Sequence, residues 1–197
     1  VRAKLSDTVW RTPFDPFKSI HEKGDFSEGN AWQYTWLVPQ DVEGLIALLG
    51  GEKPFTKKLD TLFTISGDMG KEASSDITGL IGQYAHGNEP SHHITYLYNF
   101  VGQPWKTAEK VRYIVDNLYS DKPDGLCGNE DVGQMSAWYV WNAMGMYSAN
   151  PYNGVYCIGS PSMDESVLKL ADGKTFTVKA LNNSSKKHLH SKSNIKR

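Results

Sequence analysis

Residues 124–147 read Asp-Gly-Leu-Cys-Gly-Asn-Glu-Asp-Val-Gly-Gln-Met-Ser-Ala-Trp-Tyr-Val-Trp-Asn-Ala-Met-Gly-Met-Tyr. The stretch begins as a glycine-containing loop and continues as a helix, because apolar residues recur at three- and four-residue spacing. The first N–H groups of a helix lack internal partners, so an isolated Asp131 here would usually cap the helix. Two further loops carry the same chemistry at the same kind of junction, which favours a functional role.

The composition narrows the function classes. The chain has 197 residues, a net charge of −1 and an aromatic share of 12%. This length allows a substantial core in one domain. The near-zero charge disfavours nucleic-acid binding, which needs a concentrated basic face. The basic tail at residues 186–197 is explained more simply as a frayed terminus than as a binding arm.

The cysteines, the apolar runs and the first residues say little about compartment. Cys127 and Cys157 do not establish a disulfide framework or a zinc-binding spacing, so their disulfide state stays open. No apolar run approaches the roughly 20 residues of a membrane span. Because the chain starts without an initiator Met or a signal-peptide core, we expect part of a longer polypeptide.

Helices are expected first and strands last. The predicted helices lie within residues 25–36 and at 42–49, 54–65, 92–101 and 105–119, followed by the helix of the opening stretch. The predicted strands are 155–158, 166–170 and 175–180, with a turn at 171–174. Since no βαβ alternation occurs, we predict a mainly α fold, with a helical unit over 1–150 and a β segment with the basic tail over 151–197.

Three stretches share one design, in which a loop with Gly, Asn and a carboxylate leads into an aromatic-rich helix. They are residues 27–32 (Ser-Glu-Gly-Asn-Ala-Trp), 86–93 (His-Gly-Asn-Glu-Pro-Ser-His-His) and 128–134 (Gly-Asn-Glu-Asp-Val-Gly-Gln). A toroidal helix bundle would gather such loops into an acidic pit with aromatic walls. Sugars suit this pit, because their CH faces stack on aromatic rings and their hydroxyls bond polar side chains. The predicted substrate-binding residues are Trp32, His86, His92, Asn129 and Gln134.

The carboxylates suggest catalysis or cation binding. Glycoside hydrolysis needs two carboxyl groups flanking one bond, and Glu28 and Asp131 could supply them. Such a site could also hold a hard cation such as Ca²⁺. The simpler alternatives are that Glu28 and Glu89 only interact with helix N-termini, that His92 is a hydrogen-bonded structural residue and that the tryptophans belong to the core.

The motifs resemble glycoside hydrolase family 92, whose members are calcium-dependent exo-acting α-mannosidases. The three loops and the run at residues 38–46 (Val-Pro-Gln-Asp-Val-Glu-Gly-Leu-Ile) occur in family order, and the resemblance covers most of residues 14–183. It implies an N-terminal β-sandwich followed by an (α/α)₆ barrel. This chain is similar to the later part of that barrel with its trailing strands, so the β-sandwich is an expected partner from the same polypeptide.

By position, the resemblance implies a role for each loop. Glu28 matches the general acid, Asp131 matches the general base, and Glu89 with the backbone carbonyl of Asn88 matches the calcium site. His86 precedes its motif as in α-1,2-selective members. The chain departs from some members at Asn129, where they carry a second Asp, and the lost charge could alter how the base is tuned.

We therefore expect the C-terminal part of an inverting, Ca²⁺-assisted exo-α-mannosidase that acts on mannose-terminated glycans, including N-glycans. The full-length protein is expected to be secreted or periplasmic. A second hypothesis is a non-catalytic carbohydrate-binding or assembly fragment, because half a barrel leaves faces uncovered. A third is another helical-toroid glycosidase with a different sugar.

Overall fold

The computed structural model describes residues 1–184 of the chain. Its α-helices are α1 (Ala31–Tyr34), α2 (Val42–Leu48), α3 (Glu52–Leu62), α4 (Pro104–Asn117) and α5 (Gln134–Ala143). The 3₁₀ helices are η1 (Pro39–Asp41), η2 (Glu89–Ser91), η3 (Ile94–Val101) and η4 (Pro151–Asn153). The strands are β1 (Leu80–Ile81), β2 (Tyr84–Ala85), β3 (Met146–Asn150), β4 (Val155–Ile158), β5 (Glu165–Lys169) and β6 (Thr175–Lys179).

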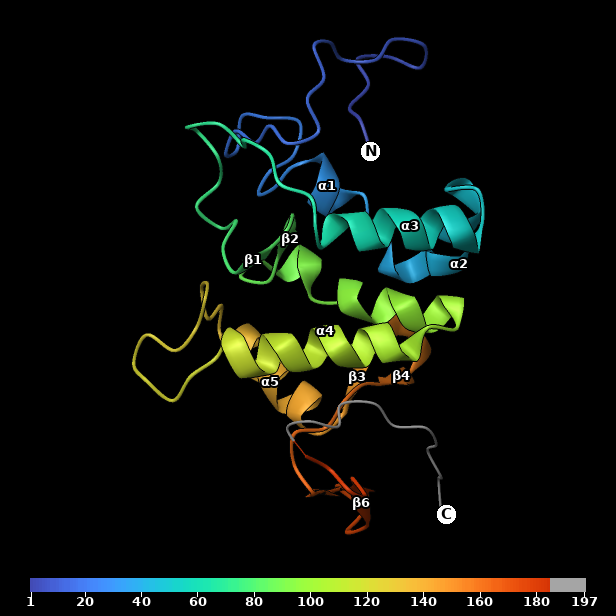
Figure 1. Cartoon of the computed structure of the whole chain (residues 1–197), viewed down its shortest axis with the longest axis vertical. Helices are drawn as coiled ribbons and strands as arrows, with labels where there is room; N and C mark the ends of the chain where they lie inside the picture. Colours follow the sequence, from blue (N-terminus) through green and yellow to red (C-terminus); the bar gives the residue numbers. More distant parts are fainter. Residues whose placement is uncertain (185–197) are drawn as a thin grey trace.

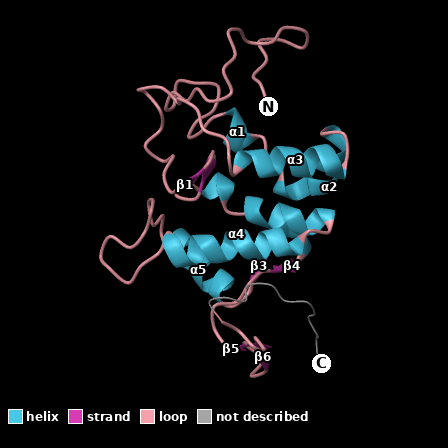
Figure 2. Cartoon of the chain, in the orientation of Figure 1, coloured by secondary structure: helices cyan, strands magenta, loops and turns pink. Residues whose placement is uncertain are grey.

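The helices occupy the middle of the molecule (Figure 1). The segment before α1 lies at one end and the β5–β6 hairpin at the other, and long loops account for much of the remaining chain (Figure 2). The described part is thus mainly helical with small hairpins, as predicted. No helix within residues 1–184 is both long and apolar enough to cross a bilayer.

The helix predictions with local signals are confirmed. Asp41 caps α2 by accepting a hydrogen bond from the Gly44 N–H at 2.9 Å. Helix α4 lies in the range predicted at 105–119 and buries one apolar face, including Val111 and Ile114. The predicted helix at 92–101 is the 3₁₀ helix η3, which ends at Gly102 in a left-handed conformation with φ of 67°. The helix predicted within 25–36 has only the four residues of α1.

Three antiparallel hairpins contain all strands of residues 1–184. The β5–β6 hairpin and its turn agree with the prediction, whereas β1, β2 and β3 are absent from it. Strand β3 pairs with β4 across the predicted boundary between residues 150 and 151, and the division into two domains stays a prediction. The basic tail at 186–197 lies outside the described residues.

One hydrophobic cluster joins the helices. Helix η3 packs against α2, α3 and α4, and Leu59, Ile94, Ile114 and Trp138 are almost completely excluded from solvent. Since these side chains come from α3, η3, α4 and α5, the cluster fixes the helices relative to one another. The loops at one end of the helices are thereby held in place.

Candidate active site

The loop carrying Glu28 is shaped by Asn30. The Asn30 side chain accepts hydrogen bonds from the N–H groups of Trp32 and Gln33, at 3.0 and 3.3 Å, while Gln33 Oε1 accepts one from the Asn30 N–H at 2.8 Å. This capping box satisfies the start of α1. Asn30, and not Glu28, therefore caps this helix, so the Glu28 carboxylate does not bind the helix N-terminus.

In the loop carrying Asp131, a neighbouring carboxylate likewise binds the start of the following helix. The Glu130 carboxylate accepts hydrogen bonds from the N–H groups of Gly133 and Ser136, and those from Ser136 lower its pKa. The N-cap residue of α5 is Gly133, and the carboxylate that binds N–H groups at the start of this helix is that of Glu130, not that of Asp131. Asp131 and Val132 are both left-handed, with φ of 47° and 57°. A β-branched residue rarely adopts this conformation, and such strain concentrates at functional sites.

Hydrogen bonds tie the first acidic loop to the second. The Asn88 side chain donates to the carbonyl oxygen of Glu28 at 3.1 Å. Gln83 takes two further bonds, with its side-chain oxygen accepting from Asn30 at 2.8 Å and its carbonyl from Gln33 at 3.0 Å. The loops at residues 27–32 and 86–93 thus form one unit, although about 60 residues separate Glu28 from Asn88 along the chain.

A backbone contact between glycines ties the second loop to the third. A Cβ atom added to Gly128 would collide with the carbonyl oxygen and Cα of Gly87. One added to Gly87 would collide with the Thr78 hydroxyl and lie 3.0 Å from the Cys127 carbonyl oxygen. Only hydrogen fits at either position, which explains why glycine precedes Asn in both loops.

The three carboxyl groups consequently share one electrostatic environment. The pKa of Glu89 is raised, first by burial, then by a hydrogen bond with Asp131 and by the negative charges of Asp131 and Glu28. No ion pair within residues 1–184 joins any of the three to a Lys, Arg or His side chain. The three loops therefore lie together in the fold, and the roles predicted for Glu28, Glu89 and Asp131 stay predictions.

Two buried histidines, His86 and His92, lie in the second loop, and burial lowers the pKa of each. His86 is fully buried, and its Nδ1 and Nε2 lie 2.8 and 2.7 Å from the hydroxyls of Tyr84 and Tyr119. Both nitrogens are engaged inside the protein, and the predicted contact of His86 with a sugar stays a prediction. The His92 ring lies 3.0 Å from the His86 carbonyl oxygen and 3.2 Å from the Gln134 amide. His92 is also buried, so it supports the exposed Gln134 from behind.

The remaining predicted substrate-binding residues, Trp32 and Asn129, are at least partly exposed. Trp32 is half-buried, with the Lys58 ammonium 4.6 Å from its ring centroid. Asn129 is exposed and donates a 3.4 Å hydrogen bond to Asp76. Sequence reasoning missed Asp76 and the two tyrosines that bind His86, because no local motif marks them and only the tertiary fold brings them here.

The donor set can be tested against calcium. Ca²⁺ takes six to eight oxygen ligands, including carboxylates and backbone carbonyls. Glu89 and the Asn88 carbonyl provide oxygens of this kind, and a divalent cation would offset both the burial and the like charges that raise the Glu89 pKa. Within residues 1–184, however, no three His, Cys, Asp or Glu side chains are grouped closely enough to hold a metal. The residues fit a partial set of ligands that substrate or other groups must complete.

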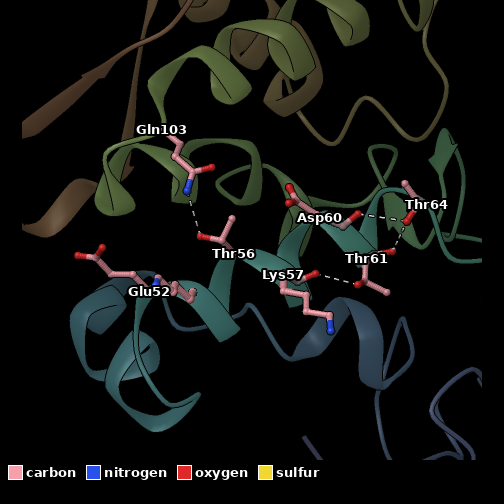
Figure 3. A pocket seen from close by; sticks show the side chains of 8 residues that line it. Glu52, Thr56, Lys57, Asp60, Thr61, Thr64 and Gln103 are labelled. Carbon is pink, nitrogen blue, oxygen red and sulfur yellow. Dashed lines mark hydrogen bonds between the residues drawn. The ribbon is translucent and has the colours of Figure 1, made fainter.

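A separate hollow of about 620 Å³ lies along α3 (Figure 3). Charged and hydroxyl side chains line it, and Gln103 reaches across to Thr56 with a 3.4 Å hydrogen bond. It has no aromatic wall and contains none of the predicted site residues. The carboxylate loops, rather than this hollow, meet the requirements of a sugar site.

Glycoside hydrolysis requires two carboxyl groups that flank one bond, and each of the three joined loops carries at least one carboxylate. The chain matches the model of the glycosyl hydrolase family 92 catalytic domain over residues 1–194. It therefore belongs to this family.

Named relatives agree with the family assignment. The chain is 44% identical to the family GH92 alpha-mannosidase BT3965 from Bacteroides thetaiotaomicron, solved in complex with mannoimidazole, with a TM-score of 0.87 over 94% of this chain and 25% of that chain. It is 40% identical to the family GH92 inverting mannosidase BT2199 from the same organism, with a TM-score of 0.71 over 89% of this chain and 25% of that one.

A curated relative is an uncharacterized secreted glycosidase from Arthroderma benhamiae. It is 33% identical over 160 residues, which make up 81% of this chain and 19% of the relative. The chain thus spans about a quarter of the solved relatives and a fifth of the curated one.

Gly128→Ala should separate the second and third loops, because its methyl group must displace the Gly87 backbone. We expect kcat/KM of the complete protein on a mannoside to fall by at least about tenfold, since small displacements of catalytic groups are costly. Gly173→Ala is the control: its turn is also strained, with φ of 81°, but nothing lies within 4 Å. Wild-type kcat/KM in Gly128→Ala would show that the contact is dispensable.

The buried histidines should make stability fall at acid pH. Burial lowers the pKa of His93 and, to about 4, that of His92. The unfolded chain therefore binds more protons between about pH 6.5 and 4, so stability present above pH 6.5 is lost as pH falls, with His92 contributing about 3 kcal/mol. Urea unfolding at several pH values measures this, and His93→Gln should flatten the dependence. A free energy of unfolding that stays constant over this range would contradict the expectation.

Proposed function

We propose that the complete protein is an exo-acting α-mannosidase that removes terminal mannose from glycans with inversion. The observation that carries this proposal is the joining of the three acidic loops, through the hydrogen bond from the Asn88 side chain to the Glu28 carbonyl and the close contact of Gly128 with the Gly87 backbone. The family and the α-mannosidases among its solved members support the choice of sugar. The proposed fold of the complete catalytic domain is an (α/α)₆ barrel, to which this chain contributes the later helices.

In the proposed mechanism, Glu28 is the general acid. Its carboxyl group would protonate the departing glycosidic oxygen, while Asp131 would take a proton from the water that attacks the opposite face of the sugar. Two helix-capping groups, Asn30 and Glu130, leave these carboxylates uncommitted. BT2199 is described as an inverting mannosidase, which supports the stereochemical part of the proposal.

Glu89 and the Asn88 carbonyl would hold Ca²⁺. When bound, the cation would take mannose hydroxyls as further ligands and help to distort the ring. The protein's own contribution is to keep two hard oxygen donors beside Asp131, where burial and like charges disfavour an additional unpaired negative charge.

Among the predicted substrate-binding residues, Trp32, Asn129 and Gln134 would face the sugar, and the buried His86 and His92 would act from behind them. Gln134 and Asn129 are exposed near the carboxylates and offer amide groups to hydroxyls. We propose an α-1,2 linkage preference from the position of His86, with N-glycans among the substrates. The β-sandwich expected in the same polypeptide would complete the pocket.

The site also suggests where the protein works. A relative from Arthroderma benhamiae is named a secreted glycosidase, and we propose a secreted or periplasmic location for the full-length protein.

A non-catalytic binding or assembly role is the second candidate. The incomplete ligand set within residues 1–184 favours it for the chain taken by itself. Release of mannose from a mannobiose by the complete protein separates the two candidates.

Glu28→Gln and Asp131→Asn in the complete protein should each lower kcat by about 10²–10⁴-fold, the usual contribution of general acid–base catalysis. Neither residue caps a helix or forms an ion pair among the described residues, so stability should change by less than about 1 kcal/mol. Glu22→Gln and Asp124→Asn, which change exposed carboxylates six and seven residues before Glu28 and Asp131 in the sequence, are matched controls. Near-normal turnover in either site variant would remove that residue from its role.

Chelation with EDTA should abolish mannose release, and added Ca²⁺ should restore it. Binding requires an ionised Glu89, so calcium affinity should weaken as pH falls toward the raised pKa of this group. Calorimetry of the metal-free protein measures the affinity, and Glu89→Gln should weaken it. Activity that is indifferent to chelation would remove calcium from the account.

A further inference from the structure

We propose that Tyr119 is a positioning residue, whose hydroxyl group ties the loop carrying Glu89 to the helix that follows Asp131. The inference rests on the proposed function. It concerns a residue outside every motif of the three acidic loops, just after the end of α4.

The geometry is a chain of three hydrogen bonds. The Tyr84 hydroxyl lies 2.8 Å from His86 Nδ1, and His86 Nε2 lies 2.7 Å from the Tyr119 hydroxyl. The Tyr119 hydroxyl also reaches the Met135 carbonyl oxygen at 3.2 Å. Tyr84 and His86 are fully buried and Met135 is 1% exposed, so water does not compete for these partners.

The protons in this chain have one consistent direction. A carbonyl oxygen only accepts, so the single hydroxyl proton of Tyr119 must point to Met135. The Tyr119 oxygen then accepts from the Nε2–H of His86, which leaves Nδ1 free to accept from the Tyr84 hydroxyl. The same tautomer is found next door, where the Nε2 of His92 donates to the His86 carbonyl. Each link therefore depends on the next one.

The role of this hydrogen-bonded series follows from the positions of His86 and Met135, which Tyr119 joins. His86 immediately precedes the glycine that contacts Gly128, and Met135 lies in the first turn of α5, four residues after Asp131. The glycine contact holds the two loops together at one point. The link from His86 through Tyr119 to Met135 holds them at a second point, and two points restrict rotation of the loop as well as its distance. Asp131 is left-handed and exposed, so it depends on such support for its orientation.

Tyr119→Phe removes the link and keeps the packing. The ring stacks on Trp138 with centroids 6.0 Å apart and contacts Tyr139 at 5.1 Å, and a phenyl ring can retain both contacts. Tyr113→Phe is the matched control, because this tyrosine on α4 is 51% exposed. In the complete protein with Ca²⁺, we expect Tyr119→Phe to lower kcat by about tenfold to a hundredfold. KM should change by less than about threefold, since ground-state contacts remain.

Hydrogen exchange measured on the same proteins supplies a second readout. Exchange should become faster in residues 86–89 and 128–135 of Tyr119→Phe, while the helices around Leu59 and Ile114 keep wild-type protection. Wild-type kcat with unchanged exchange would overturn the proposal. So would exchange that rises uniformly over the chain with normal kcat of the folded fraction, since that pattern shows only a structural role. If the unmodified protein releases no mannose, the proposed function fails. Hydrogen exchange then still tests the positioning role, because a local increase supports it and a uniform increase contradicts it.

Discussion

The site depends on the contact between the backbones of Gly87 and Gly128. Two acidic loops that are 41 residues apart meet at a distance that excludes even a methyl group. The closeness has an electrostatic cost, because the pKa of Glu89, raised first by burial, is raised further by the neighbouring Asp131. Within the described part of the chain, no Lys or Arg pairs with these carboxylates, so the charge density is kept for a cation or a proton transfer.

Each acidic loop separates structural work from chemistry. Asn30 caps α1, Glu130 caps α5, and Asn88 binds the backbone of the neighbouring loop. The carboxylates of Glu28 and Asp131 therefore do not have to bind the N-termini of the helices that follow their loops. A general acid and a general base need this freedom, because a carboxylate that stabilises a helix terminus is held by hydrogen bonds and resists protonation.

Sequence reasoning succeeded where the signal was local. The Asp41 cap, the apolar stripe of α4 and the β5–β6 turn each follow from a few adjacent residues. Strand β3 was missed because its pairing with β4 contains an irregular register and lacks a clear alternation.

The shared motif predicted that the acidic loops lie together. It did not predict the contacts that hold them together, such as the one between Gly87 and Gly128. The choice of Glu130 over Asp131 as the cap follows from two left-handed residues that no propensity anticipates. The link through Tyr119 joins distant segments, so only the fold reveals it.

The most direct measurement is a crystal structure of the complete protein with mannoimidazole and Ca²⁺ bound. We expect the inhibitor to contact Glu28, Glu89 and Asp131 together. Inversion further requires that the carboxyl groups of Glu28 and Asp131 stand about 6.5–9.5 Å apart across it. An inhibitor seated elsewhere, or a separation of about 5 Å between those carboxyl groups, would contradict the account.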